Sequence, residues 1–176
     1  MYWFRSFGKE VISLVIDDDE RREVLHLNPP HRLHAEVARL AFVRRAQEGS
    51  SKTLKSGPLR LTYIPYMADG AALYFERAMR RYRAAGIEQF FLLELDTPPT
   101  VAELAVALSS DVIYLAGGNT YAFLDQLRRA DLLPHLAAFA RAGGVLAGLS
   151  AGAILMTPTI GLAGVPDFDA DENEVG

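Results

Sequence analysis

The chain has 176 residues, of which 50% are hydrophobic and 23% are charged, so it is long enough for one globular domain and too short for two ordinary ones. Its formal net charge of -4 excludes the basic footprint of a protein that binds nucleic acid or an anionic membrane surface. No cysteine is present, which excludes disulfides, a thiol nucleophile and cysteine-based zinc sites.

No targeting or membrane-spanning segment is evident. The first ten residues, MYWFRSFGKE, lack the charged and then apolar pattern of a secretory signal. No apolar run approaches the roughly 20 residues that a helix needs to span a bilayer. We therefore expect a cytoplasmic protein that does not associate with a membrane.

Residues 1–57 are uneven in character and form an N-terminal segment distinct from the rest. An apolar run precedes four acidic residues, and we expect a hairpin of strands near 2–7 and 10–16 around Gly8-Lys9. A histidine- and proline-bearing stretch follows. The segment is thus expected to contain a hairpin and then a helix.

The predicted helix of this segment covers about 33–47, where apolar residues recur with helical spacing. Glycine, serine and proline at 49–52 and 56–58 then predict a linker or an exposed loop. We place the boundary with the second part, residues 58–176, at this loop.

From residue 58 onward, predicted strands alternate with predicted helices. The strands are 59–64, 89–95, 111–116 and 144–149, and the helices are 71–85, 101–108, 120–129, 132–142 and 151–156. Such alternation through short connections gives a parallel sheet that helices cover on both faces. The sequence therefore predicts an α/β fold, a doubly wound, mostly parallel sheet with its site at the carboxyl ends of the strands.

Three short signals mark helix ends in this part. Thr100 and Glu103 fit a capping box, in which the hydroxyl and the carboxylate satisfy each other's backbone N–H groups. Gly86 is expected to end the helix before it, and Asp131 to cap the helix over 132–142.

The strongest chemical signal is Gly148-Leu149-Ser150-Ala151-Gly152, a G-x-S-x-G between a predicted strand and a predicted helix. A serine on such a tight turn points its hydroxyl out over the sheet, and small neighbours let the backbone turn without a clash. The pattern favours Ser150 as a nucleophile. The alternative is a turn of small residues that lets the helix pack closely on the sheet.

A second signal is Gly117-Gly118-Asn119-Thr120 at the end of the preceding strand. Paired glycines expose backbone N–H groups, and either Asn119 or Thr120 can cap the next helix. Beside Ser150, this loop would supply one oxyanion donor and the N–H of Ala151 the other. The alternative is an ordinary strand-to-helix turn with a good cap.

Together these motifs resemble one known family. The matching stretches are Ala116-Gly117-Gly118-Asn119-Thr120-Tyr121, Leu132-Leu133, the glycines at 143–144, Gly148-Leu149-Ser150-Ala151-Gly152-Ala153, Pro158-Thr159-Ile160, and Ile64-Pro65 with Ala68-Asp69-Gly70. They resemble peptidase E, the family of alpha-aspartyl dipeptidases and cyanophycinases. The resemblance covers about residues 59–176 and implies a class I glutamine amidotransferase-like α/β fold.

The resemblance also implies roles for individual residues. Ser150 would be the nucleophile, and the backbone N–H groups of Gly118 and Ala151 would form the oxyanion hole. An acidic triad member is implied in the loop after Pro158. Among its five carboxylates (Asp167, Asp169, Asp171, Glu172 and Glu174) we favour the pair Asp171-Glu172. No metal or organic cofactor is implied.

One departure from the family concerns histidine. The family's catalytic histidine lies downstream of the serine, and no histidine follows Ser150 in this chain. The four histidines are His26, His31, His34 and His135. Asn28-Pro29-Pro30-His31 faintly resembles the run that carries the family's histidine, and triads do occur in different chain orders.

These observations predict a serine peptidase that cleaves small peptides, with dipeptides carrying N-terminal aspartate among its expected substrates, and that forms a homo-oligomer. Three alternatives stay open. The first is a truncated or non-catalytic relative that acts as a binding or regulatory module. The second is a cyanophycinase-like hydrolase of a β-linked aspartyl polymer. In the third, residues 1–57 form an oligomerisation arm that completes the site across an interface.

Overall fold

The computed structural model describes residues 12–18, 21–26, 30–48, 57–67, 70–157 and 159–164. The strands are β1 (Ile12–Asp18), β2 (Arg21–His26), β3 (Arg60–Ile64), β4 (Gln89–Leu92), β5 (Val112–Leu115) and β6 (Val145–Leu149). The helices are α1 (Pro30–Glu48), α2 (Ala71–Ala84), α3 (Val101–Leu108), α4 (Thr120–Arg129), α5 (Leu133–Arg141) and α6 (Ala151–Leu155), and a short 3-10 helix, η1 (Gly161–Gly164), follows.

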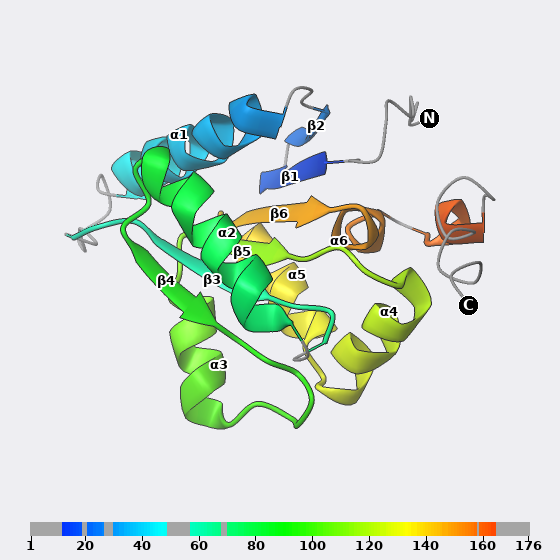
Figure 1. Ribbon diagram of the computed structural model, residues 1–176. Helices are drawn as coiled ribbons and strands as arrows, with labels where there is room; N and C mark the ends of the chain where they lie inside the picture. Colours follow the sequence, from blue (N-terminus) through cyan, green and yellow to red (C-terminus); the bar gives the residue numbers. More distant parts are fainter. Residues whose placement is uncertain are drawn as a thin grey trace.

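The six strands form one sheet in the order β2-β1-β6-β5-β3-β4 (Figure 1). Strands β6, β5, β3 and β4 are parallel, whereas β1 is antiparallel to both of its neighbours. The chain passes from β3 to β4 on one side and returns to β5 and β6 on the other. The predicted α/β fold is confirmed, and its topological switch point, where ligands bind in such sheets, lies between β3 and β5.

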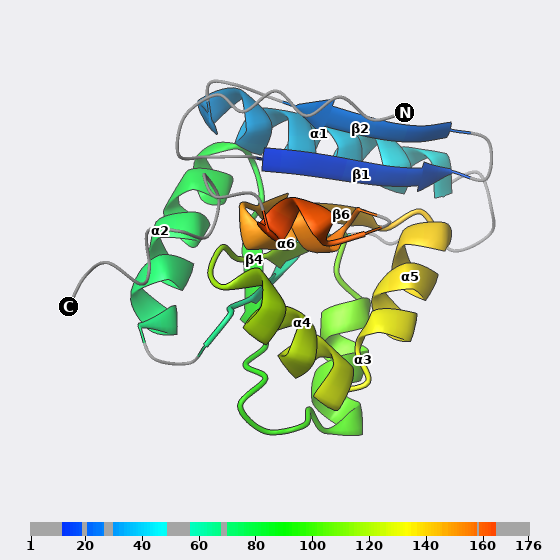
Figure 2. The same cartoon turned by 90° about the vertical axis from the view of Figure 1, so that its right-hand side faces the viewer.

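Helices cover both faces of the parallel strands (Figures 1 and 2). Helices α1 and α2 pack on one face, and α4, α5 and the start of α6 pack on the other. Along β5, Val112 and Tyr114 belong to the first core, while Ile113 and Leu115 belong to the second. Because side chains alternate across a strand, a continuous apolar run such as β5 fits a strand that is buried on both faces.

Aromatic rings organise the core under α1 and α2. The Tyr82 ring makes edge-to-face contacts with His34, at 4.8 Å between centroids, and with Tyr114, at 5.7 Å. Burial raises the pKa of Tyr82 well above its usual value and that of Tyr63 to about 12. Through its contact with Tyr82, the His34 ring packs on the core of the sheet face that α1 and α2 cover.

The N-terminal hairpin differs from the predicted one. β1 contains most of the expected strand, and its antiparallel partners are β2 on one side and β6 on the other. Both edges of β1 are thus occupied where this strand is described. The strand 2–7 itself and Gly8-Lys9 lie outside the described residues.

Two of the three predicted helix signals are confirmed. The Thr100 hydroxyl accepts a hydrogen bond from the Glu103 N–H, the Glu103 carboxylate accepts one from the Thr100 N–H, and Gly86 follows the end of α2. The expected cap at Asp131 was wrong. Leu132 precedes α5 without a side-chain cap, and Asp131 instead adopts a left-handed backbone (φ 50°) in the turn after α4.

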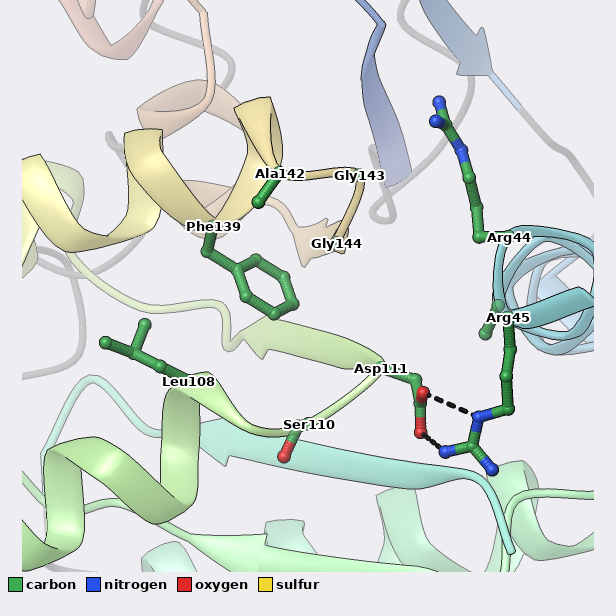
Figure 3. Close-up of a pocket in the computed structure, with 10 residues that line it drawn as sticks. Arg44, Arg45, Leu108, Ser110, Asp111, Phe139, Ala142, Gly143 and Gly144 are labelled. Carbon is green, nitrogen blue, oxygen red and sulfur yellow. Dashed lines mark hydrogen bonds and ion pairs between the residues drawn. The ribbon is translucent and has the colours of Figure 1, made fainter. Parts of the chain in front are cut away.

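A small pocket at the amino ends of β5 and β6 contains a partly buried ion pair (Figure 3). Arg45 of α1 binds both carboxylate oxygens of Asp111, which also accepts the Arg60 backbone N–H at 2.8 Å. Only 17% of the Arg45 side chain and 7% of the Asp111 side chain are exposed. The pair thus connects α1 with the starts of β3 and β5, at the edge of the sheet opposite to Ser150.

We expect Asp111→Asn to lower the free energy of unfolding by about 2 kcal/mol, because it leaves the partly buried Arg45 guanidinium without its counter-charge. The matched control is Asp125→Asn. Asp125 pairs with Arg129 on the surface of α4, and its loss should cost less than about 0.5 kcal/mol. Urea denaturation of the three proteins measures both values. Equal losses in the two variants would show that the Asp111 pair does not stabilise the fold.

Candidate active site

Ser150 lies at the turn between β6 and α6, at the carboxyl ends of the parallel strands. Its backbone has φ 48° and ψ -110°, a conformation that side-chain-bearing residues rarely adopt. Such a conformation costs about 1–3 kcal/mol and persists only where the surrounding structure fixes it. Its carbonyl accepts the Ile154 N–H at 3.0 Å, which connects the turn to the helix. The predicted strand–serine–helix turn is therefore present.

The two glycines that flank Ser150 allow this turn to pack. A Cβ on Gly152 would lie 2.3 Å from the carbonyl oxygen of Leu115, and a Cβ on Gly148 would lie 2.5 Å from the carbonyl carbon of Gly152. The Gly152 N–H also donates to the Ala116 carbonyl at 3.1 Å. The first turn of α6 thus rests directly on the backbone at the end of β5, where no other residue type fits.

The glycine loop after β5 lies against the same turn. A Cβ on Gly117 would lie 3.5 Å from the Leu149 carbonyl oxygen and 3.6 Å from the Ser150 Cβ. Asn119 closes the loop, since its side-chain oxygen accepts the Ala122 N–H at 3.0 Å and caps α4. Of the two residues expected to cap this helix, Asn119 is the one that does so.

These contacts bring three of the predicted site residues to one place. Ser150 is partly exposed, Ala151 is the fully buried first residue of α6, and Gly118 lies in the neighbouring loop. A serine hydroxyl with backbone N–H groups on two adjacent segments is the arrangement that acyl transfer requires, because one group attacks and the others hold the developing oxyanion.

The predicted acidic residues, Asp171 and Glu172, lie outside the described residues, as do Asp167, Asp169 and Glu174. Among the described residues, no group of three or more His, Asp or Glu side chains is arranged to hold a metal ion. In the same part of the chain, no helix combines the length and apolar character of a membrane span.

The four histidines lie on three elements, β2, α1 and α5. His34 packs in the core under α1, and His135 lies in α5. His26 ends β2, where Ser13 pairs with His26 on one side and with Gly148 on the other. β2 therefore runs in the direction of β6 and ends at the same edge, about 10 Å away by two strand spacings. His31 lies in the first turn of α1, five residues further along.

One residue of this region was missed by the sequence analysis. Tyr66 follows β3 and lies against Gly118, because a Cβ on that glycine would come within 2.5 Å of the tyrosine ring. The strand end Ile64-Pro65 had pointed to this edge of the sheet, but no sequence pattern pairs a tyrosine with a glycine in another loop.

Residues 43–174 match the sequence profile of Peptidase family S51. The chain belongs to this peptidase family. The resemblance to peptidase E that the motifs indicated is thereby confirmed. A search of the curated proteins gave no match.

A solved structure supports the fold of this S51 chain. It is a candidate peptidase E protein from Listeria monocytogenes EGD-e, with 24% identity and a TM-score of 0.50. The alignment covers 78% of this chain and 66% of that one, so this chain spans just under two thirds of its length. The similarity between the two structures lies in their α/β fold.

The strained backbone of Ser150 predicts an unusual stability order. Glycine adopts φ 48° more easily than alanine, so we expect Ser150→Gly to be about 1 kcal/mol more stable than Ser150→Ala. Ser109 is the matched control, because its φ of -79° suits any residue and Ser109→Gly should be no more stable than Ser109→Ala. Chemical denaturation of the four variants measures the order. An alanine variant at 150 as stable as the glycine variant would contradict the strained turn.

Proposed function

We propose that this S51 chain is a serine hydrolase of the peptidase E type that cleaves small peptides, with dipeptides carrying N-terminal aspartate as the substrate class. The observation that carries the proposal is the Ser150 turn. Its positive φ is maintained by glycines that pack on the β5 backbone, although a serine at this position is strained. Membership of a peptidase family supports the same reaction class.

In the proposed mechanism, the Ser150 Oγ attacks the carbonyl carbon of the scissile amide while its proton passes to a base. The N–H groups of Gly118 and Ala151 donate to the carbonyl oxygen as it becomes an oxyanion. The amide C–N bond then breaks, and the base returns the proton to the leaving amine. Water attacks the resulting acyl ester in the same way and regenerates the Ser150 hydroxyl.

Histidine is the proposed base, oriented by the Asp171-Glu172 pair. The sheet register favours the segment between His26 and His31 as its source within this chain, because that segment begins at the edge of the sheet where Ser150 lies. His34 is not proposed for this role, because its ring packs against Tyr82, and His135 of α5 serves as the comparison histidine.

A fluorophosphonate probe tests the proposal directly. It forms a covalent bond only with an activated serine, so we expect one adduct by intact mass on the wild-type protein and none on Ser150→Ala. Ser109→Ala, which changes an exposed serine at the end of α3, is the matched control and should be labelled like the wild type. A folded wild-type protein that takes up no label would overturn the proposed function.

Labelling also identifies the base. His26→Ala and His31→Ala are compared with His135→Ala, and loss of labelling in one of the first two locates the base in the N-terminal segment. We expect His135→Ala to be labelled at the wild-type rate. Full labelling of both N-terminal variants would assign the proton acceptor to another group and remove this segment from the mechanism.

A further inference from the structure

Tyr66 and Gly118 meet at the switch point of the sheet. Tyr66 follows Pro65 at the end of β3, and Gly118 lies in the loop after β5, the neighbouring parallel strand. The two strand ends stay in register beyond the sheet, since the Ala116 N–H donates to the Ile64 carbonyl at 3.0 Å. The backbone therefore delivers both residues to one place.

The tyrosine side chain covers the α-carbon of this glycine. A Cβ on Gly118 would lie 2.5 Å from Cδ1, 2.6 Å from Cγ and 2.7 Å from Cβ of Tyr66. The backbone of Gly118 has φ 148°, which residues with a side chain rarely adopt. Any side chain at position 118 would thus collide with Tyr66 and strain the backbone as well.

Tyr66 also packs against the hydrophobic core, through Phe123 of α4. Its ring lies 6.1 Å from the ring of Phe123, a fully buried residue of α4 in the core of that face. The Phe123 N–H donates to the Asn119 carbonyl at 2.9 Å, which connects this support to the end of the glycine loop. The tyrosine ring is therefore half-buried between the core and the loop.

The loop lies between two surfaces. Gly118 contacts the Tyr66 ring, and the preceding Gly117 approaches Leu149 and Ser150 of the serine turn. A glycine-rich loop has many accessible backbone conformations, and only some of them point a given N–H toward the serine. Contacts on both sides restrict that freedom.

We propose that Tyr66 is a positioning residue for the oxyanion loop. Its ring keeps the Gly117–Gly118 peptide in the orientation in which the Gly118 N–H faces the Ser150 hydroxyl. The inference rests on the proposed function and adds to it a residue that does not touch the reacting atoms. The ring acts by packing, so its hydroxyl is dispensable.

The test compares the rate of fluorophosphonate labelling in Tyr66→Phe, Tyr66→Leu and Tyr66→Ala. Loss of an oxyanion donor lowers rates by about 10²–10³-fold, and a misoriented donor should lower the Tyr66→Ala rate by roughly 10–100-fold. Phenylalanine retains the ring and should stay within about twofold of the wild type, with leucine between the two. The effect is expected in the maximal labelling rate and not in probe affinity.

Tyr74→Ala is the matched control, because Tyr74 is an exposed tyrosine of α2 whose removal should leave labelling unchanged. Wild-type labelling of Tyr66→Ala would overturn the inference, and so would an equal loss in Tyr66→Phe, which would assign the effect to the hydroxyl. If the alanine variant does not fold, the leucine variant decides. Absence of label on the wild type is a different result, because it overturns the proposed function itself.

A second measurement does not depend on activity. Gly118→Ala should lower the melting temperature of the wild type, because its methyl group collides with the ring. In a Tyr66→Ala background the collisions with Cγ and Cδ1 are gone and only the 2.7 Å contact with Cβ remains, so the same substitution should lower the melting temperature less. Equal shifts in both backgrounds would show that the ring does not restrain the loop.

Discussion

The first turn of α6 lies directly on the backbone at the end of β5, and the geometry of the candidate site depends on this contact. Gly152 makes it possible, since a Cβ there would come within 2.3 Å of the Leu115 carbonyl oxygen, and its N–H donates to Ala116. Because α6 packs so closely on β5, only one residue joins β6 to α6. That residue is Ser150, and it makes the tight turn by adopting a positive φ. Strain at Ser150 is thus a consequence of close packing between two neighbouring strands' ends.

The amino ends and the carboxyl ends of the parallel strands carry different kinds of contact. At the amino ends of the strands, the partly buried pair of Arg45 and Asp111 connects α1 to the strand starts (Figure 3). At the carboxyl edge, the segments after β3, β5 and β6 converge on the switch point, and each supplies a part: the Tyr66 ring, the Gly117–Gly118 loop and the Ser150 turn. The Arg45–Asp111 pair therefore lies on the side away from the serine, which is at the carboxyl ends where ligands bind in doubly wound folds.

The parts of this fold that could be predicted from sequence are those that local patterns determine. Buried strands such as β5 read as short apolar runs, the Thr100–Glu103 cap depends on neighbours in sequence, and the Ser150 turn has its own spacing. Strand pairing was not predictable, because β1 has an apolar character that fits two neighbours but does not identify them. The contact of Tyr66 with Gly118 was missed for the same reason, since it joins two loops through the register of β3 and β5.

The measurement that tests the account most directly is a crystal structure of the phosphonylated protein. The phosphoryl oxygen of the Ser150 adduct imitates the oxyanion of the acyl-transfer intermediate. The account predicts that this oxygen lies about 3 Å from the backbone nitrogens of both Gly118 and Ala151. A phosphoryl oxygen directed away from these nitrogens, or an adduct on another side chain, would contradict the assignment of this edge as the active site.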